Sequence, residues 1–275
     1  AARTLLERPS WVAIEGENIV TMQKFKYYDV GKYNTQVNSG MQYMIERKLM
    51  SSGIFEFEGR PSATTQTTCQ LEFQLTKDQV VRPADTKEQA PLHILSYDLE
   101  CNLRTVNNKL VFPEPEIDPI ITIGVVHSSG KAVFCLHETN PIEGVDVHHF
   151  PTEQEMLSAF NAYLVAYDPD FIIGHNVNRF DNVYYEKRCI HHGIKMGWSR
   201  MSGHACQVKK IVTKSNQKGT REVFRLDLPG RVILDSYEKF REDHNLRSYK
   251  LNELGKHFLK QEKFDMPYAQ IPVKF

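Results

Sequence analysis

A short apolar segment that ends in two acidic residues constrains this chain more than any other feature. Residues 92–101 read Leu-His-Ile-Leu-Ser-Tyr-Asp-Leu-Glu-Cys, which predicts a strand. Side chains two residues apart in a strand share a face, so Asp98 and Glu100 are expected side by side, with Cα atoms about 6.6 Å apart. Neighbouring carboxylates on a buried strand repel each other and resist the loss of water. Divalent Mg²⁺ or Mn²⁺, which prefer oxygen ligands, would relieve that repulsion.

Two interpretations of this acidic pair stay open at this point. Asp98 and Glu100 can simply mark the place where the strand reaches the surface, which is the ordinary meaning of an isolated Asp-x-Glu. They can also be part of a metal site, and that interpretation requires a further carboxylate elsewhere in the chain.

A second acidic motif, Gly-His-Asn-Val-Asn-Arg-Phe-Asp, occupies residues 174–181. It follows the short apolar segment Phe-Ile-Ile and leads into a helix predicted over residues 181–192, which Gly193 ends. Asp181 can be the N-cap of this helix. If its neighbourhood belongs to the same α/β layer as residues 92–101, Asp181 can instead supply a third carboxylate for the same metal ions.

The composition bounds the class of protein. An apolar fraction of 41% is enough for a core, and 275 residues allow one large domain or two. The net charge is zero, so any surface that binds nucleic acid has to be local. No apolar run approaches the roughly 18 residues of a membrane span. Five cysteines and no signal sequence favour a reduced intracellular chain, which we expect to be cut at both ends.

The elements predicted around the two motifs describe an α/β layer with a mixed sheet. Apolar strands are expected at residues 120–126 and 131–136, and the tight turn between them makes them antiparallel. Thr152 and Glu155 form a capping box, which predicts a helix with an apolar face up to Asp168.

The chain before this layer carries few chemical signals. Apolar residues at helical spacing predict a helix within residues 40–50, and alternation predicts a strand over residues 67–75. Residues 76–90 are polar and lack periodicity. We therefore predict a linker there and a domain boundary near residue 90.

With both motifs in view, the chain resembles the exonuclease domain of family B replicative DNA polymerases. The likeness is to the eukaryotic delta type and its relatives in large DNA viruses. Ser-Tyr-Asp-Leu-Glu-Cys at residues 96–101 is similar to the family's first exonuclease motif, and Asn-Val-Asn-Arg-Phe-Asp at residues 176–181 resembles the second. Residues 112–119 and 247–259 resemble further stretches, and the match extends back to about residue 66 and more faintly to residue 38.

The resemblance implies a ribonuclease-H-like α/β fold and hydrolysis of a mispaired primer end in the 3′ to 5′ direction. Two Mg²⁺ or Mn²⁺ ions would be held by Asp98, Glu100 and Asp181, with Asp98 between them and Glu100 on the ion that activates water. Asn176 and Phe180 would position the strand end. An unpaired 3′ end reaches such a site more easily than a matched end, which must first be unpaired and unstacked. The resemblance therefore implies proofreading.

The sequence also departs from the family. The third exonuclease motif, Tyr-x-x-x-Asp, supplies a fourth carboxylate in the family and occurs nowhere in this chain; the nearest spacing joins Tyr249 to Glu253. The palm motifs of the polymerase are missing, and His175 stands where Tyr is usual. We therefore expect a fragment, with residues 1–90 as part of a polymerase N-terminal domain and residues 91–275 as an exonuclease domain that stops before its third motif.

Two rival functions remain. A stand-alone DNA exonuclease would use the same carboxylates, and a DNA-binding module would carry them only as structural residues. Metal titration separates the second rival, because a binding module should show no Mn²⁺ affinity that depends on Asp98.

The one basic stretch lies between residues 207 and 231, where a turn at residues 215–219 predicts a hairpin. Six basic residues against Glu222 give it a local excess of +5 up to Arg225. The hairpin is either a solvated surface or a contact for DNA phosphates, and family members carry a hairpin that helps to separate primer from template. The candidate substrate-binding residues here are Lys209, Lys210, Lys214, Lys218 and Arg221.

Asp235 follows an apolar strand at residues 232–234 and is expected to cap a helix over residues 236–242, with metal ligation as the weaker alternative. Cys189, His191, His192, His204 and Cys206 match no zinc spacing. By analogy with the family, the expected partners are primer–template DNA, its single-stranded 3′ end, and a sliding clamp or accessory polymerase subunits, with no membrane contact. The implied location is the nucleus, or the host nucleus or viral replication site for a viral protein.

Overall fold

The computed structural model describes residues 11–13, 19–21, 39–50, 53–76, 79–215, 219–262 and 270. The chain divides into two compact units, residues 1–62 with 73–90 and residues 63–72 with 91–275. The chain passes into the second unit after residue 90, but residues 63–72, which the sequence assigns to the first domain, belong to the second. The reason is backbone hydrogen bonding, because the N–H of Thr68 donates to the carbonyl of Arg200 (2.7 Å) and that of Ser202 to Gln66 (2.9 Å).

The first unit is built of short strand pairs and a helix. The pairs are antiparallel and join β1 (Trp11–Ala13) to β2 (Ile19–Thr21), β3 (Phe55–Glu56) to β6 (Arg82–Pro83), and β4 (Arg60–Pro61) to β5 (Phe73–Gln74). The helix predicted within residues 40–50 is α2 (Ser39–Glu46). The strand predicted over residues 67–75 is wrong apart from β5, since Thr67 forms only an isolated bridge with Met201.

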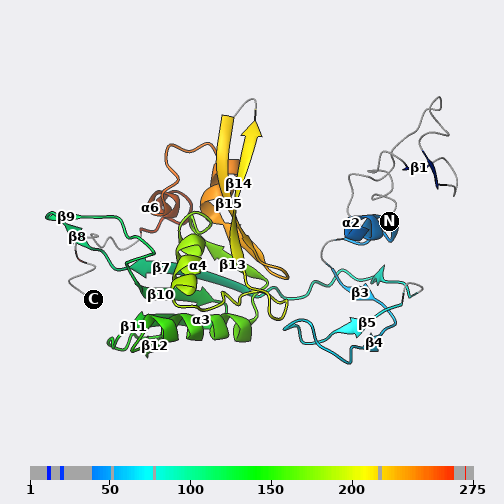
Figure 1. The fold of residues 1–275 in the computed structure, drawn as a ribbon, viewed down its shortest axis with the longest axis horizontal. Coiled ribbons are helices and arrows are strands. Elements are labelled where there is room, and N and C mark those ends of the chain that lie inside the picture. Colours follow the sequence, from blue (N-terminus) through cyan, green and yellow to red (C-terminus); the bar gives the residue numbers. More distant parts are fainter. Residues whose placement is uncertain are drawn as a thin grey trace. The chain divides into compact units, whose positions relative to one another are not determined.

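A six-stranded mixed sheet forms the centre of the second unit (Figure 1). In spatial order its strands are β12 (Asp146–Phe150), β11 (Gly130–Leu136), β10 (Ile120–His127), β7 (Ile94–Cys101), β13 (Phe171–Gly174) and β16 (Val232–Asp235). β10 runs antiparallel to both of its neighbours, β7 and β11, and its pairing with β11 is the one that the tight turn predicted. β13 lies parallel to both β7 and β16. The strand with the first motif is therefore central, where its edges are paired.

Helices and two hairpins complete the second unit. The helices are α3 (Glu153–Tyr167), α4 (Asp181–His191), α5 (Ser236–Asp243), α6 (Leu251–Leu254) and a π-helical turn at Gly255–Leu259. The predicted basic hairpin consists of β14 (Gln207–Ser215) and β15 (Gly219–Asp227). A smaller hairpin of β8 (Thr105–Val106) and β9 (Lys109–Leu110) follows β7.

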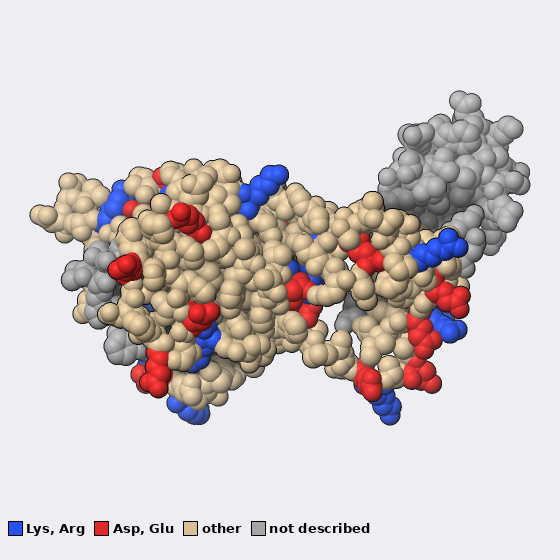
Figure 2. All heavy atoms as spheres, turned by 90° about the horizontal axis from the view of Figure 1, so that it is seen from below, with Lys and Arg blue, Asp and Glu red and all other residues tan. Residues whose placement is uncertain are grey.

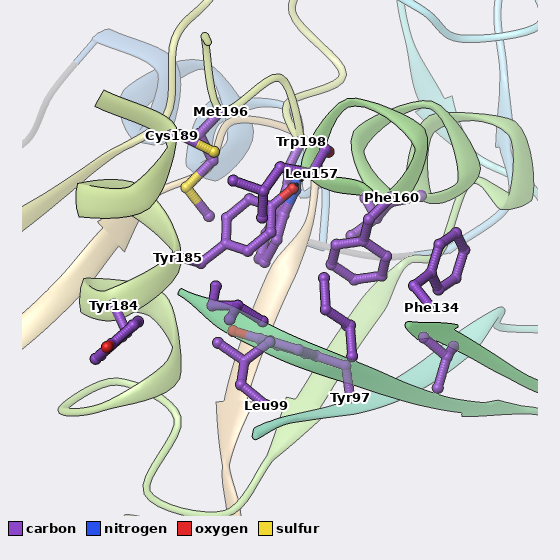
Figure 3. Close-up of a cluster of buried hydrophobic side chains, with 14 of the residues drawn as sticks. Tyr97, Leu99, Phe134, Leu157, Phe160, Tyr184, Tyr185, Cys189, Met196 and Trp198 are labelled. Carbon is purple, nitrogen blue, oxygen red and sulfur yellow. Dashed lines mark hydrogen bonds between the residues drawn. The ribbon is translucent and has the colours of Figure 1, made fainter. Parts of the chain in front are cut away.

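The core lies between one face of the sheet and helices α3 and α4 (Figure 3). Trp198 is fully buried at its centre, with ring centroids 5.4 Å from Tyr97 of β7, 5.6 Å from Phe160 of α3 and 4.8 Å from Tyr185 of α4. The contacts with Tyr97 and Phe160 are edge-to-face, a geometry that favours one arrangement of the rings. The aromatic cluster thereby fixes β7 against both helices.

The helix α3 begins at the predicted capping box. The Thr152 hydroxyl oxygen accepts the N–H of Glu155 (3.2 Å), and its O–H donates to the Glu155 carboxylate (3.0 Å). Thr152→Ala should lower the free energy of unfolding by about 1 kcal/mol, because an N–H in the first turn loses its partner. Urea denaturation measures this loss, with Ser158→Ala on the exposed side of the same helix as the control. Equal losses in the two variants would mean that the cap contributes nothing of its own.

Candidate active site

The strand β7 presents its two acidic residues on the face of the sheet opposite the core. Leu95, Tyr97 and Leu99 are buried, whereas Asp98 is exposed and Glu100 is half-buried. The two-residue period thus puts both carboxylates on one face, as expected for a strand. On the neighbouring strand β10, Gly124 lies opposite Asp98, so no side chain from that position crowds the carboxylate.

Asp181 is the first residue of α4 and is only 4% exposed. The N-cap position belongs to Phe180, which makes no side-chain cap bond, so the interpretation of Asp181 as the N-cap is wrong. Its Oδ1 instead accepts the backbone N–H of Leu99 at 3.1 Å. That N–H is available because β13 pairs with β7 only as far as Ser96. The packing of α4 thus brings Asp181 to the strand segment between Asp98 and Glu100.

The electrostatics of the site favour a cation. Burial raises the pKa of Asp181 to about 7, and the negative charge of Asp98 adds to the rise. A bound cation would favour the ionised form of Asp181, because its positive charge offsets both the loss of water around the carboxylate and the repulsion from Asp98. The donors are oxygen atoms only, which fits Mg²⁺ or Mn²⁺ better than a soft metal.

The described residues do not yet form a complete cage. Within the ranges that the structure describes, no three His, Cys, Asp or Glu side chains lie close enough together to hold a metal ion as they stand. The fold brings Asp98 and Asp181 within electrostatic reach and puts Glu100 on the face of Asp98. In the described part of the chain, Cys189 and His204 likewise belong to no such group, and His192 lies 2.7 Å from the carboxylate of Glu153.

The loop between β13 and α4 has little freedom. A Cβ on Gly174 would lie 2.7 Å from that of Val177, so no larger residue fits there without movement. Asn176 adopts a left-handed backbone with φ of 62°, which Asn tolerates better than most residues. Its carbonyl accepts the N–H groups of Arg179 and Phe180, at 3.1 and 3.2 Å. The loop therefore sets where α4 begins.

Asp235 is the predicted cap of α5, since its Oδ1 accepts the N–H of Tyr237 at 3.0 Å. The sequence did not indicate its other role. The same carboxylate accepts the N–H groups of Asn176 and Asn178, 59 and 57 residues earlier. This contact joins α5 to the second-motif loop.

An exposed aromatic residue beside the second motif was also missed. The ring of Phe112 is 75% exposed, and its centroid lies 5.6 Å from that of Phe180. An apolar ring in a Pro-rich loop was a signal available in the sequence, but its neighbour became evident only from the fold. Together the two rings form an aromatic surface next to Asp181.

The base of the hairpin is less basic than the sequence count indicated. The Lys209 ammonium lies 2.8 Å from the Asp227 carboxylate, and Lys210 lies 2.7 Å from Glu222. The count missed the first pair because it ended at Arg225, before Asp227. On the face drawn in Figure 2, acidic and basic side chains are likewise interspersed. Lys218 and the side chains of Lys214 and Arg221 lie outside the described residues.

The fold resembles that of a solved polymerase. The structure of the family B DNA polymerase from Pyrobaculum calidifontis matches with a TM-score of 0.62 and 19% identity, over 88% of this chain and 28% of that one. The prediction of a mixed, ribonuclease-H-like α/β sheet is thereby confirmed. The family model described as "DNA polymerase family B, exonuclease domain" matches residues 30–254. The chain belongs to this family.

The curated relatives point to one type within the family. The chain is 30% identical to the DNA polymerase delta catalytic subunit of Dictyostelium discoideum over 263 residues, and 33% identical to that of Glycine max over 256 residues. These matches cover 90% and 87% of this chain but 23% of each relative. The chain thus spans about a quarter of the length of these relatives. Among the described residues, no helix is long and apolar enough to cross a membrane.

Proposed function

We propose that this chain is the 3′–5′ exonuclease part of a DNA-directed DNA polymerase and removes nucleotides from an unpaired primer end. The observation that carries the proposal is the pair Asp98 and Asp181, which the fold brings together although their charges repel. In a member of this family, such a pair is best explained as a divalent-metal site.

Asp98, Glu100 and Asp181 would hold two Mg²⁺ or Mn²⁺ ions. When bound, these ions supply a nucleophilic water and stabilise the charge on the phosphate. Other residues of the chain would bind and position the end of the DNA strand. Phe112 and Phe180 offer ring faces on which a terminal base can stack, and Asn176 lies in the loop that leads to Asp181. Stacking needs an unpaired base, so a mismatched end enters more easily than a paired one.

The activity of the whole protein is part of the same proposal. We assign it template-directed DNA synthesis in replication, with primer–template DNA as substrate. A sliding clamp or accessory polymerase subunits would be its protein partners, and the nucleus its location, or a viral replication site. Residues 1–90 would belong to the polymerase N-terminal domain. The support is the likeness to delta catalytic subunits.

Digestion of 5′-labelled single-stranded DNA with Mn²⁺ tests the proposal. We expect a ladder of products shortened from the 3′ end, and slower digestion of the matched duplex, because fraying costs free energy. A phosphorothioate linkage at the 3′ terminus is the control, since it should retard the first step only. Internal cuts, or products that form without a divalent ion, would rule the proposal out.

One observation favours a second candidate, a DNA-binding module without hydrolysis. Within the described ranges the carboxylates do not form a ready three-ligand metal cage. Such a module would bind the labelled DNA, leave its length unchanged and show no Mn²⁺ affinity that depends on Asp98.

The hairpin should contact DNA through the residues near its turn. Lys214→Gln with Lys218→Gln should reduce the salt dependence of single-strand binding by about 1.4 in the log–log slope, since each phosphate contact contributes about 0.7. Lys209→Gln with Lys210→Gln is the matched control and should change the slope less, because both ammonium groups are already paired with carboxylates. Fluorescence anisotropy against salt measures both slopes. A larger change in the control pair would place the contact at the base of the hairpin instead.

A further inference from the structure

Asp235 lies at the junction of three segments and is 5% exposed. Its Oδ1 accepts the N–H of Asn176 at 2.9 Å and that of Tyr237 at 3.0 Å, and its Oδ2 accepts the N–H of Asn178 at 3.0 Å. A carboxylate that accepts several backbone N–H groups is strongly held. One side chain therefore caps α5 and fastens the loop that leads to Asp181.

The fastened loop needs such an anchor. It contains the left-handed Asn176 and the tight approach of Gly174 to Val177, and α4 begins directly after it. An amide N–H that is removed from water without a partner costs free energy, so the loop conformation depends on its acceptors. Without Asp235, the N–H groups of Asn176 and Asn178 would lose theirs.

A hydrogen-bonded path continues from this anchor to the strand with the first motif. The Asn178 side chain donates to Glu238 of α5 (3.3 Å) and accepts from Asn182 of α4 (3.4 Å). Asn182 in turn accepts the O–H of Tyr97 at 2.6 Å, next to Asp98. Asn178 and Asn182 are buried, so these bonds do not compete freely with water.

We propose that Asp235 is a positioning residue, which holds the second-motif loop so that Asp181 stays beside Asp98, and that it is not itself a metal ligand. Its two oxygens already accept three backbone N–H groups, so ligation of a metal ion would compete with these hydrogen bonds. The charge of Asp235 does reach Asp181, so the two carboxylates lie near one another. The catalytic part of this inference rests on the proposed exonuclease function. The structural part, that Asp235 holds the loop, does not.

Two substitutions separate capping from loop anchoring. Asp235→Asn keeps an oxygen for the cap and for Asn176 but turns an amide N–H₂ towards Asn178. Asp235→Ser can still cap α5, yet its single, shorter hydroxyl cannot serve Asn176 and Asn178 as well. Asp243→Asn, near the exposed end of the same helix, is the matched control. Hydrogen exchange of the Asn176 and Asn178 amides, Mn²⁺ titration and digestion of single-stranded DNA are measured on the whole chain.

We expect faster exchange of the Asn178 amide in Asp235→Asn, and of both amides in Asp235→Ser, by about tenfold or more. Mn²⁺ affinity and digestion rate should fall in the graded order of wild type, Asp235→Asn and Asp235→Ser, with a loss of about tenfold to a hundredfold in the last. The Asp243→Asn variant should match wild type in all three measurements.

Unchanged exchange of both amides in Asp235→Ser would overturn the anchoring role. If Asp235→Asn loses Mn²⁺ affinity as completely as Asp98→Ala does, Asp235 is a metal ligand. That result would also overturn the proposal. If the wild-type chain itself does not digest DNA, the proposal that this chain alone is an active exonuclease fails instead. The exchange rates and the graded Mn²⁺ affinities then still decide whether Asp235 positions the carboxylate site.

Discussion

Asp98→Ala should reduce digestion of single-stranded DNA from the 3′ end by about a thousandfold. The carboxylate is proposed to hold both metal ions, which contribute several kcal/mol of transition-state stabilisation, and each 1.36 kcal/mol corresponds to a factor of ten in rate. The fold should persist, since Asp98 is exposed and lies opposite Gly124. Its removal also relieves repulsion with Asp181, so the melting temperature should not fall.

The matched control for this substitution is Asp146→Ala, at an exposed position of the edge strand β12. It should digest DNA at the wild-type rate. Mn²⁺ titration gives a second measurement that does not depend on catalysis. Asp98→Ala should abolish high-affinity binding of Mn²⁺. Undiminished digestion by Asp98→Ala would assign the chemistry to other residues.

The second large effect concerns pH. Asp181 has a pKa of about 7 in the folded chain, because of burial and the charge of Asp98, against about 3.9 for an unfolded Asp. Between these values the folded state keeps a proton that the unfolded state has lost. This contribution to stability is fully present below pH 4 and disappears as the pH rises through 7. Relative to Asp181→Asn, the free energy of unfolding should fall by about 1.4 kcal/mol per pH unit in that window.

Urea denaturation from pH 4 to pH 8 measures this difference. Asp181→Asn is a suitable reference because its amide oxygen can still accept the N–H of Leu99. Added Mg²⁺ should flatten the slope above pH 6, since a cation stabilises the ionised carboxylate. If the difference in the free energy of unfolding between wild type and Asp181→Asn stays constant with pH, Asp181 has an ordinary pKa.

The repeating patterns of the chain identified its main elements because each depends on neighbours in the sequence. The alternation in residues 94–101 made the strand and its two faces evident, and Thr152 with Glu155 marked the start of α3. Gly193 follows closely on the end of α4, as expected. Period, caps and turns act over a few residues, which is why they can be read without a structure.

Contacts between distant segments were the part that the sequence could not supply. Residues 63–72 were misassigned because their hydrogen bonds go to Arg200 and Ser202, far along the chain. The contact of Lys209 with Asp227, 18 residues later, arises only when the two strands of the hairpin pair. The sequence left two interpretations of Asp181 open, because its acceptor role towards Leu99, 82 residues earlier, arises only when α4 packs on the sheet.

Residue patterns were enough to predict the family, the strand with Asp98 and Glu100, and the position of Asp181 at the start of a helix. The tertiary structure alone decided that Asp181 is buried against that strand, and that Asp235 fastens the loop before it. The physical reason is the distance along the chain over which each interaction acts. Backbone preferences and apolar periods are local, whereas the pKa of a carboxyl group and the partners of a buried amide depend on whichever distant segments share the core.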